Sequence, residues 1–238
     1  MQKKLEAYFE NESNFYTSGT LIHPECSMVV MDPKTGRILA LAGGTGKKTA
    51  NRTLNYATQT HRSPGSSIKP LSVYAPAIDK GYITYGSVID DTPVKFVPNG
   101  YGGMRGWPQN YPSGYRGLTT VRDAICRSVN TVAVKILQKN GPENAFSLLY
   151  DQMNMKSLVR SSGKNGYTYT DIAESPLALG QLTRGVTVKE ITAGYTALAN
   201  NGCFSNGKTV LKILDAEGKV IVDNEETPTQ IFSAQPLR

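Results

Sequence analysis

Hydrophobic and polar positions follow two periods along this chain, which predicts a mixture of helices and strands. Residues 2–11 look like a polar helix, and two apolar runs within 26–42 flank a turn, as in a β-hairpin. Residues 208–223 alternate apolar and polar positions around Asp215-Ala-Glu-Gly218, a second hairpin signature. Helical spacing predicts further helices at 119–139, 142–151, 176–182 and 187–200. We therefore expect one compact α+β unit.

Two segments rich in turn-forming residues lie between the first hairpin and these helices. Residues 43–53 contain glycines and lysines, but their spacing does not match a phosphate-binding loop, so a flexible loop is predicted. Residues 90–117 carry many Gly, Pro and Tyr residues and predict a long irregular segment. Its Trp107 could line a groove or simply pack the loop.

The first candidate for chemistry is Ser66, which stands three positions before Lys69 and directly after a Pro-Gly turn. If a helix opens at this turn, the two side chains lie on one face, and the lysine amine can reach the serine hydroxyl. A desolvated lysine can then act as the base that activates a serine nucleophile. A serine that only caps a helix fits the same pattern. Two other Ser-x-x-Lys copies, Ser161–Lys164 and Ser205–Lys208, lie in turn-like stretches and are not expected to be catalytic.

The second candidate is Ser128-Val129-Asn130, the one Ser-x-Asn of the chain, which interrupts two apolar helical stretches. A break between helices can turn a hydroxyl and an amide toward a cleft. There the serine could relay a proton, and the asparagine could hold both a lysine and a substrate amide. The alternative is an ordinary cap or kink.

In this order and about sixty residues apart, the two motifs resemble the first two boxes of the active-site serine penicillin-recognising enzymes, whose third box is Lys-Thr-Gly. Further similarity points to class A penicillin-binding proteins, and it extends from about Ser27 to Gly202. The segments that carry it are 32–44, 55–58, 107–111, 115–117, 177–180, 185–187 and 197–202. The resemblance implies an α+β, penicillin-binding/β-lactamase-like transpeptidase fold, with an antiparallel sheet flanked by helices and a helical subdomain.

The chain departs from the family at the third box. Its one Lys-Thr-Gly, Lys34-Thr35-Gly36, precedes the serine and reads as a hairpin turn. We therefore expect residues 1–238 to be the N-terminal portion of one transpeptidase domain, truncated before its last strands. Its parts would be a first strand pair (26–42), a helical region with both boxes (60–202) and a β-hairpin (203–225). The missing C-terminal part of the domain would be its partner, and the chain alone would be inactive.

The resemblance also implies a reaction. Ser66, with Lys69 as base, would attack the D-Ala-D-Ala carbonyl of a peptidoglycan stem peptide. Ser128 would protonate the leaving D-alanine, and Asn130 would bind the donor peptide. A neighbouring amine would then form the crosslink, and β-lactams would trap Ser66 as an ester. The alternatives are a non-catalytic penicillin-binding sensor or interaction domain, and a serine β-lactamase, for which the Glu-x-x-Leu-Asn loop of class A enzymes is absent.

The amino-acid composition limits the kinds of binding partner and cofactor that we expect. The net charge is +7, but the basic residues are scattered and no nucleic-acid module is visible, so an anionic cell envelope fits better than nucleic acid. Two histidines and three widely spaced cysteines offer no metal site, and no cofactor is expected. Cys126 is expected to pack in a helix.

No apolar run in the sequence approaches the roughly 20 residues of a membrane span. The resemblance nevertheless implies a membrane-anchored parent protein, with this domain on the extracytoplasmic face of the bacterial cell membrane.

Overall fold

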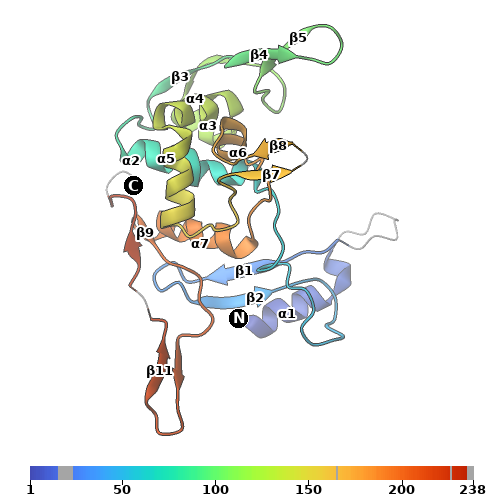
Figure 1. Ribbon diagram of the computed structural model, residues 1–238, viewed down its shortest axis with the longest axis vertical. Helices are drawn as coiled ribbons and strands as arrows, with labels where there is room; N and C mark the ends of the chain where they lie inside the picture. Colours follow the sequence, from blue (N-terminus) through green and yellow to red (C-terminus); the bar gives the residue numbers. More distant parts are fainter. Residues whose placement is uncertain (16–23, 165, 226, 235–238) are drawn as a thin grey trace. The chain divides into compact units, whose positions relative to one another are not determined.

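The computed structural model describes residues 1–15, 24–164, 166–225 and 227–234 (Figure 1). The chain forms two compact units, each built from separated stretches of sequence, where the pattern of the sequence alone predicted one. Unit 1 comprises Met1–Arg62, Met153–Ser157 and Val186–Ile231, and unit 2 comprises Ser63–Gln152, Leu158–Gly185 and the residues from Phe232 onward. Within the described residues, no helix combines the length and the apolarity needed to cross a membrane.

Unit 1 is built on the predicted first hairpin. Strands β1 (Met28–Met31) and β2 (Ile38–Ala42) pair antiparallel, and the Lys34-Thr35-Gly36 turn joins them as predicted. The Asp32 carboxylate accepts hydrogen bonds from the Thr35 hydroxyl and the Lys34 amide, and both bonds lower the pKa of that carboxyl group. This Lys-Thr-Gly is therefore a structural turn.

Helices cover the hairpin of unit 1 (Figure 1). Helix α1 (Gln2–Glu10) contacts β2, and α7 (Val188–Ala199) contacts β1. Helix α7 begins with a reciprocal capping box between Thr187 and Glu190, which satisfies two orphan donors of its first turn. The remaining elements are η1 (Glu12–Asn14), β9 (Cys203–Phe204), β10 (Lys212–Leu214), β11 (Val220–Asp223) and β12 (Thr229–Gln230), with β9 paired to β12 and β10 to β11.

Unit 2 surrounds one buried helix, α4 (Asn130–Asn140). Four consecutive residues of α4, Thr131 to Val134, are fully buried, and Ile136 is 1% exposed. A helix that is apolar on nearly every face belongs in a core. The elements packed against α4 include η3 (Pro70–Tyr74), α2 (Ala75–Asp79), α3 (Val121–Cys126), α5 (Pro142–Ser147) and α6 (Glu174–Leu179). Two further elements are η4 (Leu148–Gln152) and η2 (Gly65–Ile68).

Residues 90–117 were expected to form a long irregular segment, and this expectation was wrong. Instead of being irregular, they contribute to two antiparallel pairs. These pairs join β3 (Val88–Asp91) to β6 (Gly117–Thr120), and β4 (Lys95–Pro98) to β5 (Met104–Trp107). Most of the Gly and Pro residues that suggested irregularity lie in the connections between these strands. In one of them, Asn99 accepts two backbone hydrogen bonds that close the β4–β5 turn. A third pair, β7 (Ser162–Lys164) with β8 (Tyr167–Tyr169), completes unit 2.

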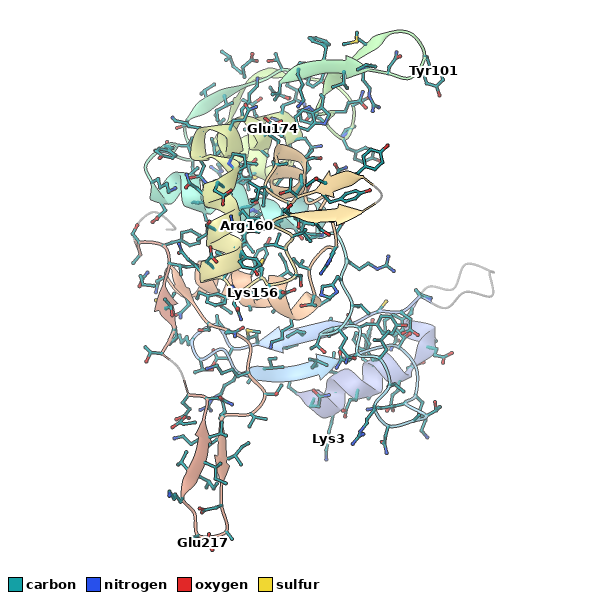
Figure 2. All side chains as sticks on the ribbon, viewed as in Figure 1. Lys3, Tyr101, Lys156, Arg160, Glu174 and Glu217 are labelled. Atoms are coloured by element: carbon teal, nitrogen blue, oxygen red, sulfur yellow. The ribbon has the colours of Figure 1, made fainter. Side chains whose placement is uncertain are left out.

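The β4–β5 and β10–β11 hairpins both end in exposed turns. Tyr101 lies at the end of the β4–β5 hairpin and Glu217 at the end of the β10–β11 hairpin (Figure 2). Cys126 is also exposed, which corrects its expected role in helix packing, because it is the last residue of α3 and faces solvent. All three cysteines are free.

Candidate functional site

The Ser-x-x-Lys motif lies at the start of a helical segment that passes from a 3₁₀ helix to a π-helix and then to an α-helix. Ser66 is in η2, a 3₁₀ helix with three residues per turn, so side chains at i and i+3 are eclipsed. The Lys69 amide donates to the Ser66 carbonyl and closes this turn. Ser66 is exposed, whereas Lys69 is 2% exposed. The cap position belongs to Pro64, and among the described residues the Ser66 hydroxyl has no hydrogen bond, so Ser66 is not a helix cap.

Proline explains why the predicted helix changes its winding after Lys69. Pro70 has no amide hydrogen to donate to the Ser66 carbonyl, so the α-helical ladder cannot begin there. The next turn is a π-helix, in which the Ala75 amide donates to the Pro70 carbonyl. The α-helix α2 then starts with Pro76 in its first turn, where a missing donor costs little.

Lys69 points to the second motif. Its Nζ atom lies 2.8 Å from the Ser128 carbonyl oxygen, 3.1 Å from Ser128 Oγ and 2.6 Å from Asn130 Oδ1. These three acceptors match the three donors of an ammonium group. The structure thus brings Lys69, Ser128 and Asn130 together, while no hydrogen bond in the described structure links Lys69 Nζ to Ser66 Oγ. Burial of Lys69 disfavours its charged form and lowers its pKa to about 8.

Ser128 has a backbone conformation that is uncommon for serine. Its φ of 55° is left-handed. The Val129 amide donates to the Ala124 carbonyl, and the Ser128 amide donates to the Ile125 carbonyl. This pair of bonds forms a Schellman motif, in which glycine usually occupies the position of Ser128. The motif ends α3, and after one extended residue Asn130 begins α4, so the predicted break between helices exists.

Three residues that sequence analysis did not single out hold Asn130. The Asn130 Nδ2 group donates to the Gln109 carbonyl oxygen at 2.7 Å, and the Asn130 amide donates to Asn110 Oδ1 at 2.8 Å. Asn110 Nδ2 in turn donates to the buried Asp91 at 2.7 Å. The available signal was the position of Gln109 and Asn110 within 107–111, a segment with family similarity; nothing local marked Asp91.

A pocket of about 420 Å³ lies beside the Ser-x-Asn motif. Its lining includes Asp91, Asn110, Tyr111, Arg116, Arg127 and Val129. A larger cavity of about 580 Å³ belongs to unit 1, between α1, β2 and residues 43–56, and contains none of the four predicted site residues. Among the residues that the structure describes, no group of three or more His, Cys, Asp or Glu side chains could hold a metal ion.

The two other Ser-x-x-Lys copies have different surroundings. Ser205 is buried and donates to the Pro33 carbonyl, whereas Lys208 Nζ donates to the Asn224 carbonyl. Ser161 precedes β7 in an exposed position. Lys208 is half-buried, in contrast to the buried Lys69 that follows Ser66.

Comparisons with known proteins identify relatives over most of this chain. Penicillin-binding protein 1A of Clostridium botulinum (strain Langeland) is 31% identical over 97% of this chain and 27% of that protein. Penicillin-binding protein 4 of Bacillus subtilis is 31% identical over 97% of this chain and 34% of that protein. The chain therefore spans about a quarter to a third of the length of these curated relatives.

Solved structures match the fold. The PonA1 protein of Mycobacterium tuberculosis, determined in complex with penicillin V, matches with a TM-score of 0.69 and 22% identity over 99% of this chain and 57% of that chain. Penicillin-binding protein 1A of Haemophilus influenzae matches with a TM-score of 0.67 and 23% identity over 91% of this chain and 34% of that chain. The α+β fold is thus that of penicillin-binding protein transpeptidases.

The model of the penicillin binding protein transpeptidase domain matches residues 26–238, which is most of the chain. The chain therefore belongs to the penicillin-binding protein transpeptidase family.

Proposed function

We propose that this chain provides the serine, lysine and Ser-x-Asn groups of a D,D-transpeptidase that crosslinks peptidoglycan stem peptides on the extracytoplasmic face of the bacterial membrane. One observation carries the proposal. Lys69, buried and with its pKa lowered to about 8, follows the exposed Ser66 by one 3₁₀ turn and contacts both functional groups of the Ser-x-Asn motif. Family membership supports this choice of reaction.

The first half of the reaction forms an acyl-enzyme. Neutral Lys69 takes the Ser66 proton, and Ser66 Oγ attacks the carbonyl carbon between the two D-alanines of a stem peptide. The tetrahedral intermediate then collapses with cleavage of the C–N bond. Ser128, hydrogen-bonded to Lys69, passes the proton on to the departing amine of D-alanine. Asn130 orients the donor peptide through its amide.

The second half transfers the acyl group. The amine of a neighbouring stem peptide attacks the ester carbon, and its proton returns through Ser128 and Lys69 as Ser66 Oγ leaves. The new amide bond is the crosslink. A β-lactam follows the first half only, because its opened ring remains attached and no separate leaving group departs, so Ser66 stays esterified.

Labelling of the natural full-length protein with fluorescent penicillin tests the proposal. We expect one adduct, located on Ser66 by peptide mass spectrometry, and none in the Ser66→Ala variant. Because Ser66 is exposed and has no side-chain hydrogen bond in the described structure, this variant should keep its stability within about 0.5 kcal/mol.

Ser161→Ala is the matched control, since Ser161 also precedes a lysine by three positions and is exposed. It should label like the unaltered protein. An adduct on any other serine would contradict the assignment of Ser66, and rapid hydrolysis of the adduct would favour a β-lactamase.

A further inference from the structure

Asp91 is a buried carboxylate whose hydrogen bonds join three segments of unit 2. It is 1% exposed and ends strand β3. It accepts from Asn110 Nδ2 at 2.7 Å, from the Arg116 amide at 3.0 Å and from the hydroxyl of Thr131. A buried charge without partners would be strongly destabilising, so these three donors hold the loop that follows β5 and the start of α4 at fixed positions.

Asn110 completes the connection by capping α4 from another part of the sequence. The residue before α4, Val129, has no side chain that could cap it. Asn110 Oδ1 instead accepts from the amides of Asn130 and Thr131, at 2.8 and 3.4 Å. These are donors of the first helical turn, which have no partner within the helix. The cap therefore acts on the very residue that contacts Lys69.

The Asn130 side chain is consequently held on both sides. Its backbone amide is bound by Asn110, its Nδ2 group donates to the Gln109 carbonyl at 2.7 Å, and its Oδ1 atom faces Lys69 at 2.6 Å. Because Nδ2 is engaged by Gln109, the amide presents its oxygen, and not its nitrogen, to the lysine.

We infer that Asp91 and Asn110 are positioning residues, which act through Asn130 to hold the Ser-x-Asn motif against Lys69. This role rests on the proposed function, in which Lys69 and Asn130 act on the substrate. Displacing a reacting group by about 1 Å can slow catalysis about 100-fold, so the loss of a cap on Asn130 should be visible in the acylation rate.

The test compares Asn110→Ala with Asn99→Ala in the natural full-length protein. Asn99 is a close match, because it is also half-buried and its Oδ1 also accepts from two backbone amides, at 2.8 and 3.0 Å, but in the β4–β5 turn. We expect Asn110→Ala to slow acylation by labelled penicillin at least about tenfold, and Asn99→Ala to leave it unchanged. Equal rates in the two variants would overturn the inference.

A second variant separates positioning from a loss of folding. Asn110→Asp places two carboxylates face to face, whereas the double variant Asp91→Asn with Asn110→Asp exchanges donor and acceptor and restores their match. We expect the double variant to acylate at least about threefold faster than Asn110→Asp alone. A double variant no faster than the single one would contradict the inferred hydrogen bond.

A third measurement does not need penicillin. With carbon-13-labelled lysine, nuclear magnetic resonance can follow the titration of Lys69, whose signal is identified by its loss in Lys69→Ala. Asn110→Ala should lower the midpoint, since the ammonium loses an oriented acceptor, and Asn99→Ala should not. If the unaltered protein failed to react with penicillin, the proposed function would fall. The positioning role would then be judged by this midpoint, and an unchanged midpoint would overturn it.

Discussion

At the scale of single residues, Lys69 gives the candidate site its pH dependence. Burial lowers its pKa from the ordinary value near 10.5 to about 8. Below pH 8 the amine is protonated and cannot take the Ser66 proton; above pH 8 it is neutral and can. The acylation rate should therefore rise with pH, with a midpoint near 8, and then level off.

Stopped-flow acylation between about pH 6 and 10 measures this profile. Lys69→Ala should be slow at every pH and lack the midpoint. A rate that falls as the pH rises through 8 would show that protonated Lys69 is the active form, which contradicts its proposed role as a base.

Ser128 offers a prediction about stability. Its left-handed φ of 55° costs a non-glycine residue about 1 kcal/mol or more, and glycine escapes this cost. Ser128→Gly and Ser128→Ala both remove the hydroxyl, so their difference isolates the backbone term. Denaturant unfolding should show the glycine variant to be more stable by about 1 kcal/mol. Equal stabilities would mean that the left-handed conformation is not occupied.

Sequence reasoning at this scale was limited to residues within short motifs. Lys69, Ser128 and Asn130 could be nominated because fixed spacings mark them, and the structure brings them within hydrogen-bonding distance. Asp91 could not be nominated, because the role of its carboxylate depends on a tertiary hydrogen bond from Asn110, 19 positions along the chain. The acceptor of the Ser66 proton likewise stays a prediction, since Lys69 is directed to the second motif.

At the scale of elements, the turn that carries Ser66 depends on a close backbone contact. A Cβ atom added to Gly180, at the end of α6, would lie 2.1 Å from the Gly65 carbonyl oxygen, and Gly180 has a φ of 73°. Gly180→Ala should therefore destabilise the protein by at least about 2 kcal/mol and displace the Ser66 turn, which slows acylation.

Gly81 is the matched control for this prediction. It follows α2, has a φ of 69°, and has open space where a Cβ atom would be added. Gly81→Ala carries the backbone strain without the clash, so it should cost about 1 kcal/mol and leave the acylation rate intact. Thermal unfolding and penicillin labelling of both variants check this. Equal effects would show that the contact between Gly180 and Gly65 is unimportant.

Helices and strands could be predicted from the sequence where their hydrophobic periodicity was strong. Short strands between turn-rich connections were harder to predict. The hairpin within 26–42, the one around Asp215–Gly218 and α7 were confirmed. The strands between 90 and 117 were missed because each is four residues long and largely exposed, which leaves almost no periodic signal. The helix expected to open near Ser66 also differs from a regular α-helix. Because Pro70 lacks an amide hydrogen, this segment consists of a 3₁₀ turn, a π-helical turn and the short α-helix α2.

At the scale of the whole molecule, the chain passes repeatedly between its two units. The long segment that forms most of unit 2 leaves unit 1 after Arg62 and returns to it at Val186, and a backbone pairing joins these two positions. Arg62, the last residue of the first stretch of unit 1, and Val186, where unit 1 resumes after Gly185, exchange hydrogen bonds of 3.0 and 2.9 Å. Most of unit 2, including every predicted site residue, lies between these two positions in sequence. Such an arrangement has no local sequence signal, because it depends on pairing between residues 124 positions apart, from 62 to 186.

The same distribution of burial predicts how stability varies over the molecule. Amide hydrogens of α4 should exchange most slowly, because its side chains form the core of unit 2. Those of β10 and β11 should exchange fastest among the strands, because nearly all residues of this isolated two-stranded hairpin are exposed. Helix α7, in the same unit as that hairpin, is the internal reference and should be intermediate. Hydrogen exchange read by mass spectrometry of the natural protein measures this order. Exchange in the β10–β11 hairpin as slow as in α7 would mean that the hairpin is covered by a partner, and would contradict its exposure in the fold described for this chain.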